Sequence, residues 1–219
     1  MTPKDADVIV LTYNRKELLL QLLARLAKQR SVNFNLIVTD DGSAQTIDPA
    51  AFPLITRYLW ARNDGYHRVA RLNEAMAMCP SPCIILLDDD CLPGSPRFID
   101  GHLATLKEHP ISRGVLKFPN VPDAGEWFST ANLGIRADVM RGVGYFDPAY
   151  DGAYGFEDMD LGNALEKAGY RAGPAVEATL AWHVGDFYAG GDRSDAVTGR
   201  NRRYFMSKWG YDPMPPPPA

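Results

Sequence analysis

The feature that most constrains the fold is an alternation of short apolar runs and segments with helical periodicity in the first half of the chain. Residues 8–11 and 83–87 are uninterrupted apolar runs. Such runs are typical of strands that are covered on both faces of a parallel sheet. Between residues 18 and 26, leucines recur at the spacing of one helix face. We therefore predict an α/β fold with a mixed, mainly parallel central sheet flanked by helices.

Further elements are expected along the chain. The remaining strands are expected at residues 35–39, 57–60, 114–118, 132–135 and 179–183. The remaining helices are expected at residues 69–78, 157–168 and 196–208. The first helix is expected to be capped by Asn14, with Glu17 completing a capping-box-like pair. The helix at 157–168 is expected to end at Gly169 and to bury Leu161, Ala164, Leu165 and Ala168.

Length and charge limit the class of protein. A chain of 219 residues favours one large domain, which we place at residues 1–211, followed by a proline-rich tail at 212–219 that we expect to be disordered. The net charge of −4 argues against nucleic acid as a partner. No apolar stretch comes near the roughly 18 residues of a membrane span, and the N-terminus lacks a signal-peptide pattern. The three cysteines match no CxxC site and fit a reducing compartment. We therefore expect a cytoplasmic protein.

Carboxylates gather where two of the expected strands end. Asp40 and Asp41 follow the strand at 35–39, and Asp88, Asp89 and Asp90 follow the buried strand at 83–87. The carboxyl ends of parallel strands line the ligand crevice of an open α/β sheet. Because residues two apart in an extended segment project the same way, Asp88 and Asp90 can converge on Mg²⁺ or Mn²⁺. A solvated acidic turn explains the same residues, so the cluster alone leaves both interpretations open.

A set of short motifs follows the order and spacing of one enzyme family. The motifs are Thr12-Tyr13-Asn14-Arg15, Asp40-Asp41-Gly42-Ser43, Leu87-Asp88-Asp89-Asp90, Asn132-Leu133-Gly134-Ile135-Arg136, Gly144-Tyr145-Phe146-Asp147 and Gly155-Phe156-Glu157-Asp158-Met159-Asp160-Leu161. They span roughly residues 7–184 and resemble the family 2 glycosyltransferases of the GT-A fold. The resemblance implies a single GT-A domain that transfers a sugar from a nucleotide-sugar donor with inversion at the anomeric carbon.

The resemblance also implies a donor site and a DxD metal motif. The residues it assigns to the nucleotide sugar are Thr12, Tyr13, Asn14, Arg15, Asp41, Asp88 and Asp89. Asp41 would accept from the base N–H, and Asp90 would bind Mn²⁺ or Mg²⁺ together with Asp88. A UDP-sugar is the expected donor, while GDP- and dTDP-sugars remain open. The segment at 63–73 departs from the family pattern because Leu72 stands where an arginine is common. The positive charge near the diphosphate is therefore expected from His67, Arg68 or Arg71.

The catalytic and acceptor residues are implied by the later motifs. Asp158 matches the family's general base, which removes the proton of the acceptor hydroxyl. The acceptor-binding residues are expected to be Glu157, Trp127 and Asn132. His183 matches a position where related enzymes place a metal-binding histidine, which would favour Mn²⁺ over Mg²⁺. Structural alternatives remain for each: acidic residues favour helix N-termini, Trp127 can simply pack, and a histidine at a strand end is often structural.

Partners and competing functions complete the prediction. The resemblance implies a glycan or lipid-linked acceptor of a polysaccharide pathway, and it leaves open both the oligomeric state and a peripheral position at the inner face of the membrane. The glycines at 190 and 191 and the arginines at 193, 200, 202 and 203 resemble a mobile lid, or else form a solvated basic helix. The alternatives are an inactive nucleotide-sugar-binding protein and a nucleotidyltransferase, although no glycine-rich loop follows the first strand. A phosphatase of the D-x-D-x-T type is excluded by Leu92.

Overall fold

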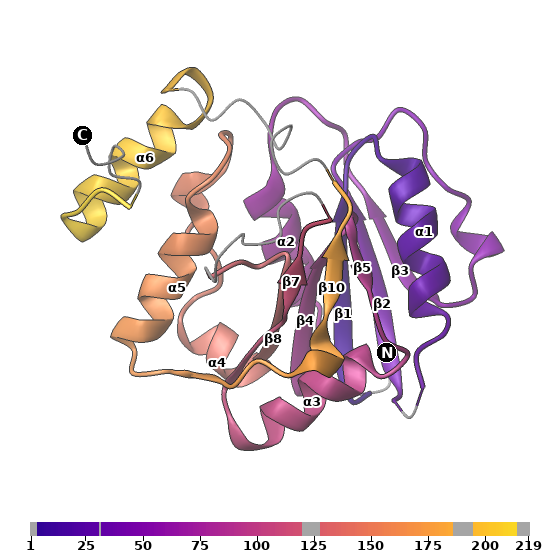
Figure 1. Cartoon of the computed structure of the whole chain (residues 1–219). Helices are drawn as coiled ribbons and strands as arrows, with labels where there is room; N and C mark the ends of the chain where they lie inside the picture. The colour runs from indigo at the N-terminus through magenta and orange to yellow at the C-terminus, as the bar shows by residue number, and fades with distance from the viewer. Residues whose placement is uncertain (1–3, 31, 120–127, 186–194, 214–219) are drawn as a thin grey trace.

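The computed structural model describes residues 4–30, 32–119, 128–185 and 195–213. A seven-stranded sheet runs through the molecule, with helices on both faces (Figure 1). Its strands, in spatial order, are β3 (Ile55–Trp60), β2 (Phe34–Asp40), β1 (Ala6–Thr12), β4 (Cys83–Asp88), β8 (Asn132–Arg136), β6 (Ile111–Arg113) and β9 (Ala172–Gly173). Strands β3, β2, β1 and β4 are parallel, whereas β8 is antiparallel to both of its neighbours. The predicted mixed, mainly parallel sheet is confirmed.

A second, three-stranded sheet and six helices complete the described fold. The small sheet has the order β5 (Cys91–Pro93), β10 (Ala181–His183) and β7 (Leu116–Lys117). The α-helices are α1 (Lys16–Leu26), α2 (Arg68–Ala77), α3 (Phe98–Glu108), α4 (Ala137–Gly142), α5 (Glu157–Lys167) and α6 (Asp195–Trp209). Three short 3₁₀ helices lie at Pro49–Ala51, Pro148–Tyr150 and Glu177–Thr179.

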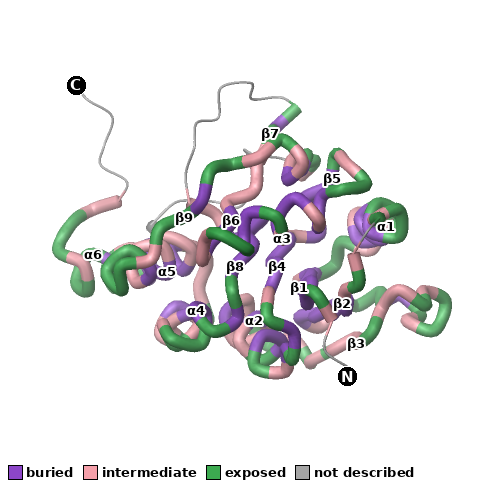
Figure 2. Tube along the Cα trace, turned by 90° about the horizontal axis from the view of Figure 1, so that it is seen from below, coloured by how far each residue is buried: buried purple, intermediate pink, exposed green. Residues whose placement is uncertain are grey.

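The sheet is buried on both faces because its apolar residues alternate between two core layers. Ile9 and Ile37 pack with residues of α2, α4, α5 and α6. Val10 and Val38 pack with residues of α1 and α3. Figure 2 shows α2 and α4 on one side of the central strands and α3 on the other. The apolar runs in the sequence are therefore continuous because each strand contributes side chains to both layers.

The strand register brings the polar ends of three strands to one edge. Thr12 of β1 is level with Asp40 of β2, and Leu11 of β1 is level with Asp88 of β4. After β2 the chain turns at Gly42, whose φ is +86°. A Cβ at this position would lie 2.3 Å from the backbone nitrogen of Asn63, so only glycine fits the turn. This carboxyl edge carries the site described below.

The expected helix cap at Asn14 was wrong. Helix α1 begins at Lys16 without a side-chain cap. Asn14 instead adopts a φ of 52°, its side-chain oxygen accepts from the Ala44 backbone at 2.9 Å, and its backbone N–H donates to Ser43 Oγ at 2.8 Å. Because asparagine tolerates the left-handed region, it can tie the loop after β1 to the turn after β2.

Several element boundaries also differ from the prediction. The strand expected at 114–118 is confined to β7, and Gly114 before it lies directly against the Asn132 side chain. The strand expected at 179–183 begins only at Ala181, after a 3₁₀ turn. Ala168 is exposed rather than buried, although α5 does stop before Gly169.

Two helices were missed altogether. Helix α3 contains Gly101, where a Cβ would lie 2.8 Å from Ala178, so a residue that disfavours helices is used for close packing. Helix α4 has only six residues and shows too little periodicity to be recognised. The proline-rich segment from residue 214 onward lies outside the described residues. None of the helices in the described ranges has the length and apolar character of a transmembrane helix.

Candidate functional site

A cleft of about 440 Å³ opens at the carboxyl edge of the sheet. Most of its walls come from the loops after β1, β2, β3 and β4. Its lining residues are Leu11, Thr12, Tyr13, Arg15, Asp41, Asn63, Gly65, Tyr66, Arg68, Asp88, Asp89, Asp90, Tyr154 and His183. The strand ends that carry the predicted motifs therefore surround one cavity, as expected for an open α/β sheet.

Three consecutive carboxylates form the floor of the cleft. Asp89 accepts hydrogen bonds from Thr12 Oγ1 at 2.7 Å and from the Arg15 guanidinium at 3.2 Å. The same guanidinium nitrogen lies 2.8 Å from Asp90 Oδ2. Burial raises the pKa of Asp89 to about 7, although Thr12 and Arg15 oppose this effect. Arg15 thus balances part of the negative charge that the motif concentrates here.

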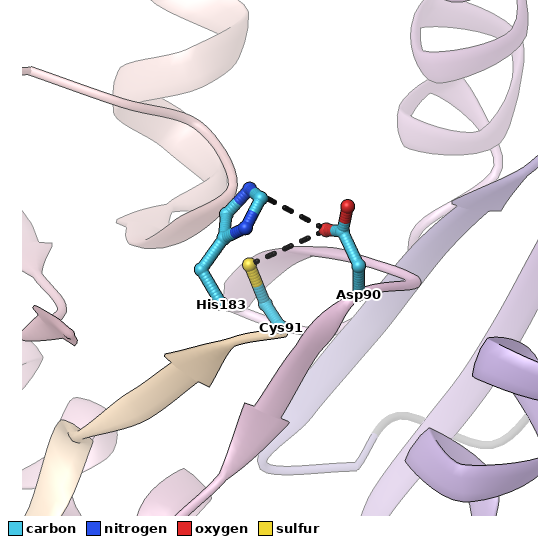
Figure 3. A group of neighbouring side chains, drawn as sticks. All are labelled: Asp90, Cys91 and His183. Carbon is cyan, nitrogen blue, oxygen red and sulfur yellow. Dashed lines mark hydrogen bonds and ion pairs between the residues drawn. The ribbon is translucent and has the colours of Figure 1, made fainter. Parts of the chain in front are cut away.

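Asp90, Cys91 and His183 bring three side-chain donors close together (Figure 3). Strand β10 pairs antiparallel with β5, which places His183 level with Cys91, and His183 Nε2 lies 3.6 Å from Asp90 Oδ1. The chain after β10 passes so close that a Cβ at Gly185 would lie 2.2 Å from Asp90 Oδ2.

This donor set fits a divalent metal ion. Burial raises the pKa of the Cys91 thiol well above its usual range, so without a metal Cys91 is protonated. The remaining donors, a carboxylate oxygen and an imidazole nitrogen, suit a borderline divalent cation such as Mn²⁺. His183 also has a buried Nδ1 with no hydrogen-bond partner among the described residues.

Asp41 marks the opposite wall of the cleft. Its Oδ2 accepts from the His67 backbone N–H at 3.1 Å and from Asn63 Nδ2 at 3.3 Å. Its Oδ1 is buried and has no hydrogen-bond partner among the described residues. Burial raises the pKa of Asp41. An oxygen of this kind is satisfied by a ligand that brings an N–H or O–H donor into the cleft.

Arg68 joins the floor of the cleft to a second group of carboxylates. Its NH2 nitrogen donates to Asp88 Oδ1 at 2.9 Å and to Thr130 Oγ1 at 3.3 Å, and its Nε lies 3.1 Å from Glu157 Oε1. Thr130 in turn donates to Asp158, from its hydroxyl at 2.7 Å and from its backbone N–H at 3.2 Å. Asp88 and Glu157 thereby pair with one largely buried cation, which is linked to Asp158 through Thr130.

Glu157 and Asp158 start helix α5 from an unusual backbone conformation. Phe156, directly before them, has a φ of 72°, which is strained for a non-glycine residue. Asn201 of α6 holds the preceding loop by donating to the carbonyls of Tyr150, Ala153 and Gly155. Burial, followed by the charge of Asp158, raises the pKa of Glu157 to about 7.

Most residues that the sequence singled out meet at this site. Those that line the cleft are Thr12, Tyr13, Arg15, Asp41, Arg68, Asp88, Asp89, Asp90 and His183. Glu157 contacts Arg68, and Asp158 contacts Thr130. Asn14 and Arg71 are not among the lining residues, although Arg71, which pairs with Glu74 at 3.0 Å, also lies 4.0 Å from Asp41 Oδ1. Trp127 lies outside the described residues.

Two expected roles are corrected by the geometry. Asn132 is buried in the sheet, where its amide donates to the carbonyls of Val115 and Thr179 and its oxygen lies 2.9 Å from His102 Nε2, so it has no free group for an acceptor. The His67 ring lies between Asp64 and Asp151, at 2.8 Å from each, and does not face the cleft. These two carboxylates raise the pKa of His67.

Sequence reasoning missed several residues of the site. Thr130 carries no motif signal, because a threonine before a strand is common. Tyr66 and Tyr154 also line the cleft and contact each other edge to face, with ring centroids 5.8 Å apart. Among the arginines of the expected lid, Arg200 instead donates to the carbonyls of Ala149 and Asp151, and residues 190, 191 and 193 lie outside the described residues.

Comparison with known proteins places these features in context. The sequence model described as Glycosyl transferase family 2 matches residues 7–123, just over half of the chain. Validoxylamine A glucosyltransferase of Streptomyces hygroscopicus subsp. jinggangensis (strain 5008) is 24% identical over 234 residues, which cover 81% of this chain and 54% of the relative. Hyaluronan synthase of Pasteurella multocida is 33% identical over 107 residues, which cover 47% of this chain and 11% of the relative. The chain thus spans about half the length of the glucosyltransferase that it matches.

Solved structures show the same fold at low sequence identity. A fragment of S. aureus TarS in complex with UDP-GlcNAc aligns with a TM-score of 0.76 and 15% identity, over 96% of this chain and 68% of that one. A mannosyltransferase from Pyrobaculum calidifontis in complex with GDP-Man and Mn²⁺ aligns with a TM-score of 0.69 and 16% identity, over 99% of this chain and 67% of that one. At such identities the likeness establishes the fold of the chain alone. Its chemistry has to be inferred from the residues of the site.

Proposed function

The chain belongs to glycosyl transferase family 2, and from that premise we propose that it is a metal-dependent, inverting transferase that uses a nucleotide diphosphate sugar. The observation that carries the proposal is the arrangement of carboxylates around one cleft. Asp88 and Asp90 lie on its floor, and Asp158 lies beyond Arg68. The cleft is thus suited to a charged donor, and Asp158, linked to the cleft residue Arg68 through Thr130, is suited to proton removal.

The nucleotide would occupy the side of the cleft next to Asp41. Asp41 Oδ1 has no hydrogen-bond partner among the described residues, with Arg71 Nε 4.0 Å away, and can accept from an N–H of the base. Thr12, Tyr13 and Asn63 line the same cavity. A uracil ring offers one such N–H, in agreement with a UDP-sugar as the expected donor. The complexes of TarS with UDP-GlcNAc and of the mannosyltransferase with GDP-Man show that this fold accepts both nucleotides, so the experiment below includes both.

Asp88, Asp90 and His183 would hold the divalent metal. A bound cation would neutralise the charge that develops on the leaving diphosphate. Arg15 already contacts Asp89 and Asp90 and adds a fixed positive charge at the same end of the cleft. The Mn²⁺ bound by the mannosyltransferase supports the assignment to this chain.

Asp158 would act as the general base. Its carboxylate would remove the proton of an acceptor hydroxyl while the hydroxyl oxygen forms a bond to the anomeric carbon. The bond from that carbon to the diphosphate oxygen breaks, and the diphosphate leaves with the electron pair from the opposite face, which inverts the configuration. Glu157 would bind further hydroxyls of a glycan or lipid-linked acceptor.

Nucleoside diphosphate release tests this proposal. UDP-, GDP- and dTDP-sugars would be incubated with the protein in Mn²⁺, Mg²⁺ or EDTA, with Asp90→Ala and Asp158→Asn as site variants. Asp138→Asn serves as the matched control, because Asp138 is exposed and its ion pair within the described ranges is with Arg136 on the surface. We expect one donor to be turned over, with loss of release in EDTA and in both site variants.

The competing function is an inactive nucleotide-sugar-binding protein. It predicts that a nucleotide sugar raises the melting temperature in the presence of metal while no nucleoside diphosphate is released with any acceptor. The absence of both release and stabilisation with every nucleotide would refute the transferase and the binding protein together.

A further inference from the structure

Thr130 holds both oxygens of the Asp158 carboxylate. The Thr130 hydroxyl donates to Oδ1 at 2.7 Å, and the backbone N–H of the same residue donates to Oδ2 at 3.2 Å. Two donors from one residue fix the plane of a carboxylate, whereas a single hydrogen bond would let it rotate. Each oxygen keeps a second lone pair that can accept a proton.

The direction of the hydroxyl hydrogen bond is set by Arg68. A guanidinium can donate but cannot accept, so at 3.3 Å its NH2 nitrogen must donate to the Thr130 oxygen. The single hydrogen of the Thr130 hydroxyl is then directed toward Asp158 rather than toward Arg68. Arg68 is itself fixed, because the same nitrogen donates to Asp88 and its Nε faces Glu157.

The main chain ties this unit to the donor end of the cleft. Thr130 is buried, with 1% of its surface exposed, and the carbonyl of the next residue, Ala131, accepts from the backbone N–H of Asp88 at 3.1 Å. The segment that orients Asp158 is therefore attached to the end of β4, where the donor carboxylates begin. Asp88 is thus linked to Asp158 through Arg68 and Thr130, and to the Thr130 segment through this backbone contact.

We propose that Thr130 is a positioning residue for the general base. Arg68 orients the Thr130 hydroxyl, and the hydroxyl aligns Asp158 with the acceptor oxygen. This alignment requires Asp88 to hold Arg68 in the position described above. The inference rests on the proposed function, since it requires Asp158 to be the base. Thr130 does not line the cleft itself and acts through Asp158.

Thr130→Val tests the hydroxyl, because valine keeps the shape of threonine and removes both the donor and the acceptor. The substrate is the nucleotide sugar from which wild type releases nucleoside diphosphate fastest. We expect kcat to fall about tenfold or more, which corresponds to an increase of ~1.4 kcal/mol in the activation free energy, while the donor KM stays within about twofold. Thr130→Ser keeps the hydroxyl and is expected to recover most of kcat. Thr105→Val is the matched control, because the Thr105 hydroxyl donates only to the Gly101 carbonyl in α3.

Each outcome decides between the proposals. A Thr130→Val protein with kcat within about twofold of wild type, or a Thr130→Ser protein as slow as Thr130→Val, overturns the positioning role while the transferase stands. A wild-type protein that releases no nucleoside diphosphate overturns the proposed function and this inference with it. If the Thr130→Val protein does not melt cooperatively, two other variants decide the question by the same comparison of kcat and KM. Thr130→Ala removes the hydroxyl and Arg68→Lys removes the guanidinium, and neither adds bulk.

Discussion

Replacement of Glu157 by glutamine should stabilise the protein at pH 8 and have no such effect at pH 4. Glu157 is buried beside Asp158, and only one of its oxygens faces Arg68, since Oε2 has no hydrogen-bond partner among the described residues. Burial and then the Asp158 charge raise the pKa of Glu157 to about 7 from the ordinary 4.5, despite the opposing effect of Arg68. The native state therefore binds a proton that the unfolded chain has already lost.

The magnitude follows from linkage between proton binding and folding. Between pH 4.5 and 7 Glu157 holds more of its proton in the native state than in the unfolded state, so its contribution to the free energy of unfolding falls as the pH rises through this window. The pKa difference corresponds to about 3 kcal/mol, at ~1.36 kcal/mol per pKa unit. Glutamine carries no charge at any of these values, so the advantage of Glu157→Gln should grow from near zero below pH 4.5 to about 3 kcal/mol at pH 8.

Urea unfolding followed by circular dichroism at pH 4, 5, 6, 7 and 8, in EDTA, measures this difference directly. Glu166→Gln controls for the change in net charge, because the Glu166 side chain is 70% exposed. A difference between Glu157→Gln and wild type that is the same at pH 4 and pH 8 would refute the reasoning. It would mean that water or a rearranged Arg68 compensates the Glu157 charge in the folded protein.

Three further predictions address the base, the metal and the core. Asp158→Asn should lower nucleoside diphosphate release by about 10²–10⁴-fold while the donor still raises the melting temperature, and loss of that stabilisation would contradict a role confined to proton transfer. Asp90→Ala should abolish the difference in melting temperature between Mn²⁺ and EDTA in the presence of the nucleotide, which differential scanning fluorimetry would detect. Burial lowers the pKa of His102 from 6.5 to about 4, so His102 should contribute a loss of up to about 3 kcal/mol of stability as the pH falls through this window, opposite in sign to the contribution of Glu157 and measured as the difference between wild type and His102→Asn. Urea unfolding should show no such loss in His102→Asn.

The sequence was most informative where a strand ends in a polar motif. The runs at 8–11 and 83–87 predicted strands buried on both faces, and the parallel arrangement placed Asp41 and Asp88 at the same edge. Both predictions depend only on the apolar pattern and on the direction of the strands. The family resemblance extended this prediction to Asp158, which no local pattern could identify as a base.

The sequence was least informative where the role of a residue depends on hydrogen bonds to residues far away in the sequence. Asn132 matches a family motif, yet His102 and two carbonyls occupy its amide, and no pattern near Asn132 reveals these contacts. Thr130 is recognisable only because the fold brings Arg68 and Asp158 to opposite sides of its hydroxyl. Contacts of this kind follow from tertiary packing and not from local sequence.

The pairing of β10 with β5 has a consequence for the order in which the protein folds. His183 meets Asp90 only after the chain has passed through β8, α4 and α5 and has returned beside the end of β4. Pairings between residues so distant in sequence form slowly, since the entropy of closing the intervening loop must be overcome first. The sheet of β1, β2 and β4 can assemble from the first part of the chain alone, whereas the approach of His183 to Asp90 must wait for β10. A nascent chain can therefore pair its first strands well before Asp90 and His183 can meet.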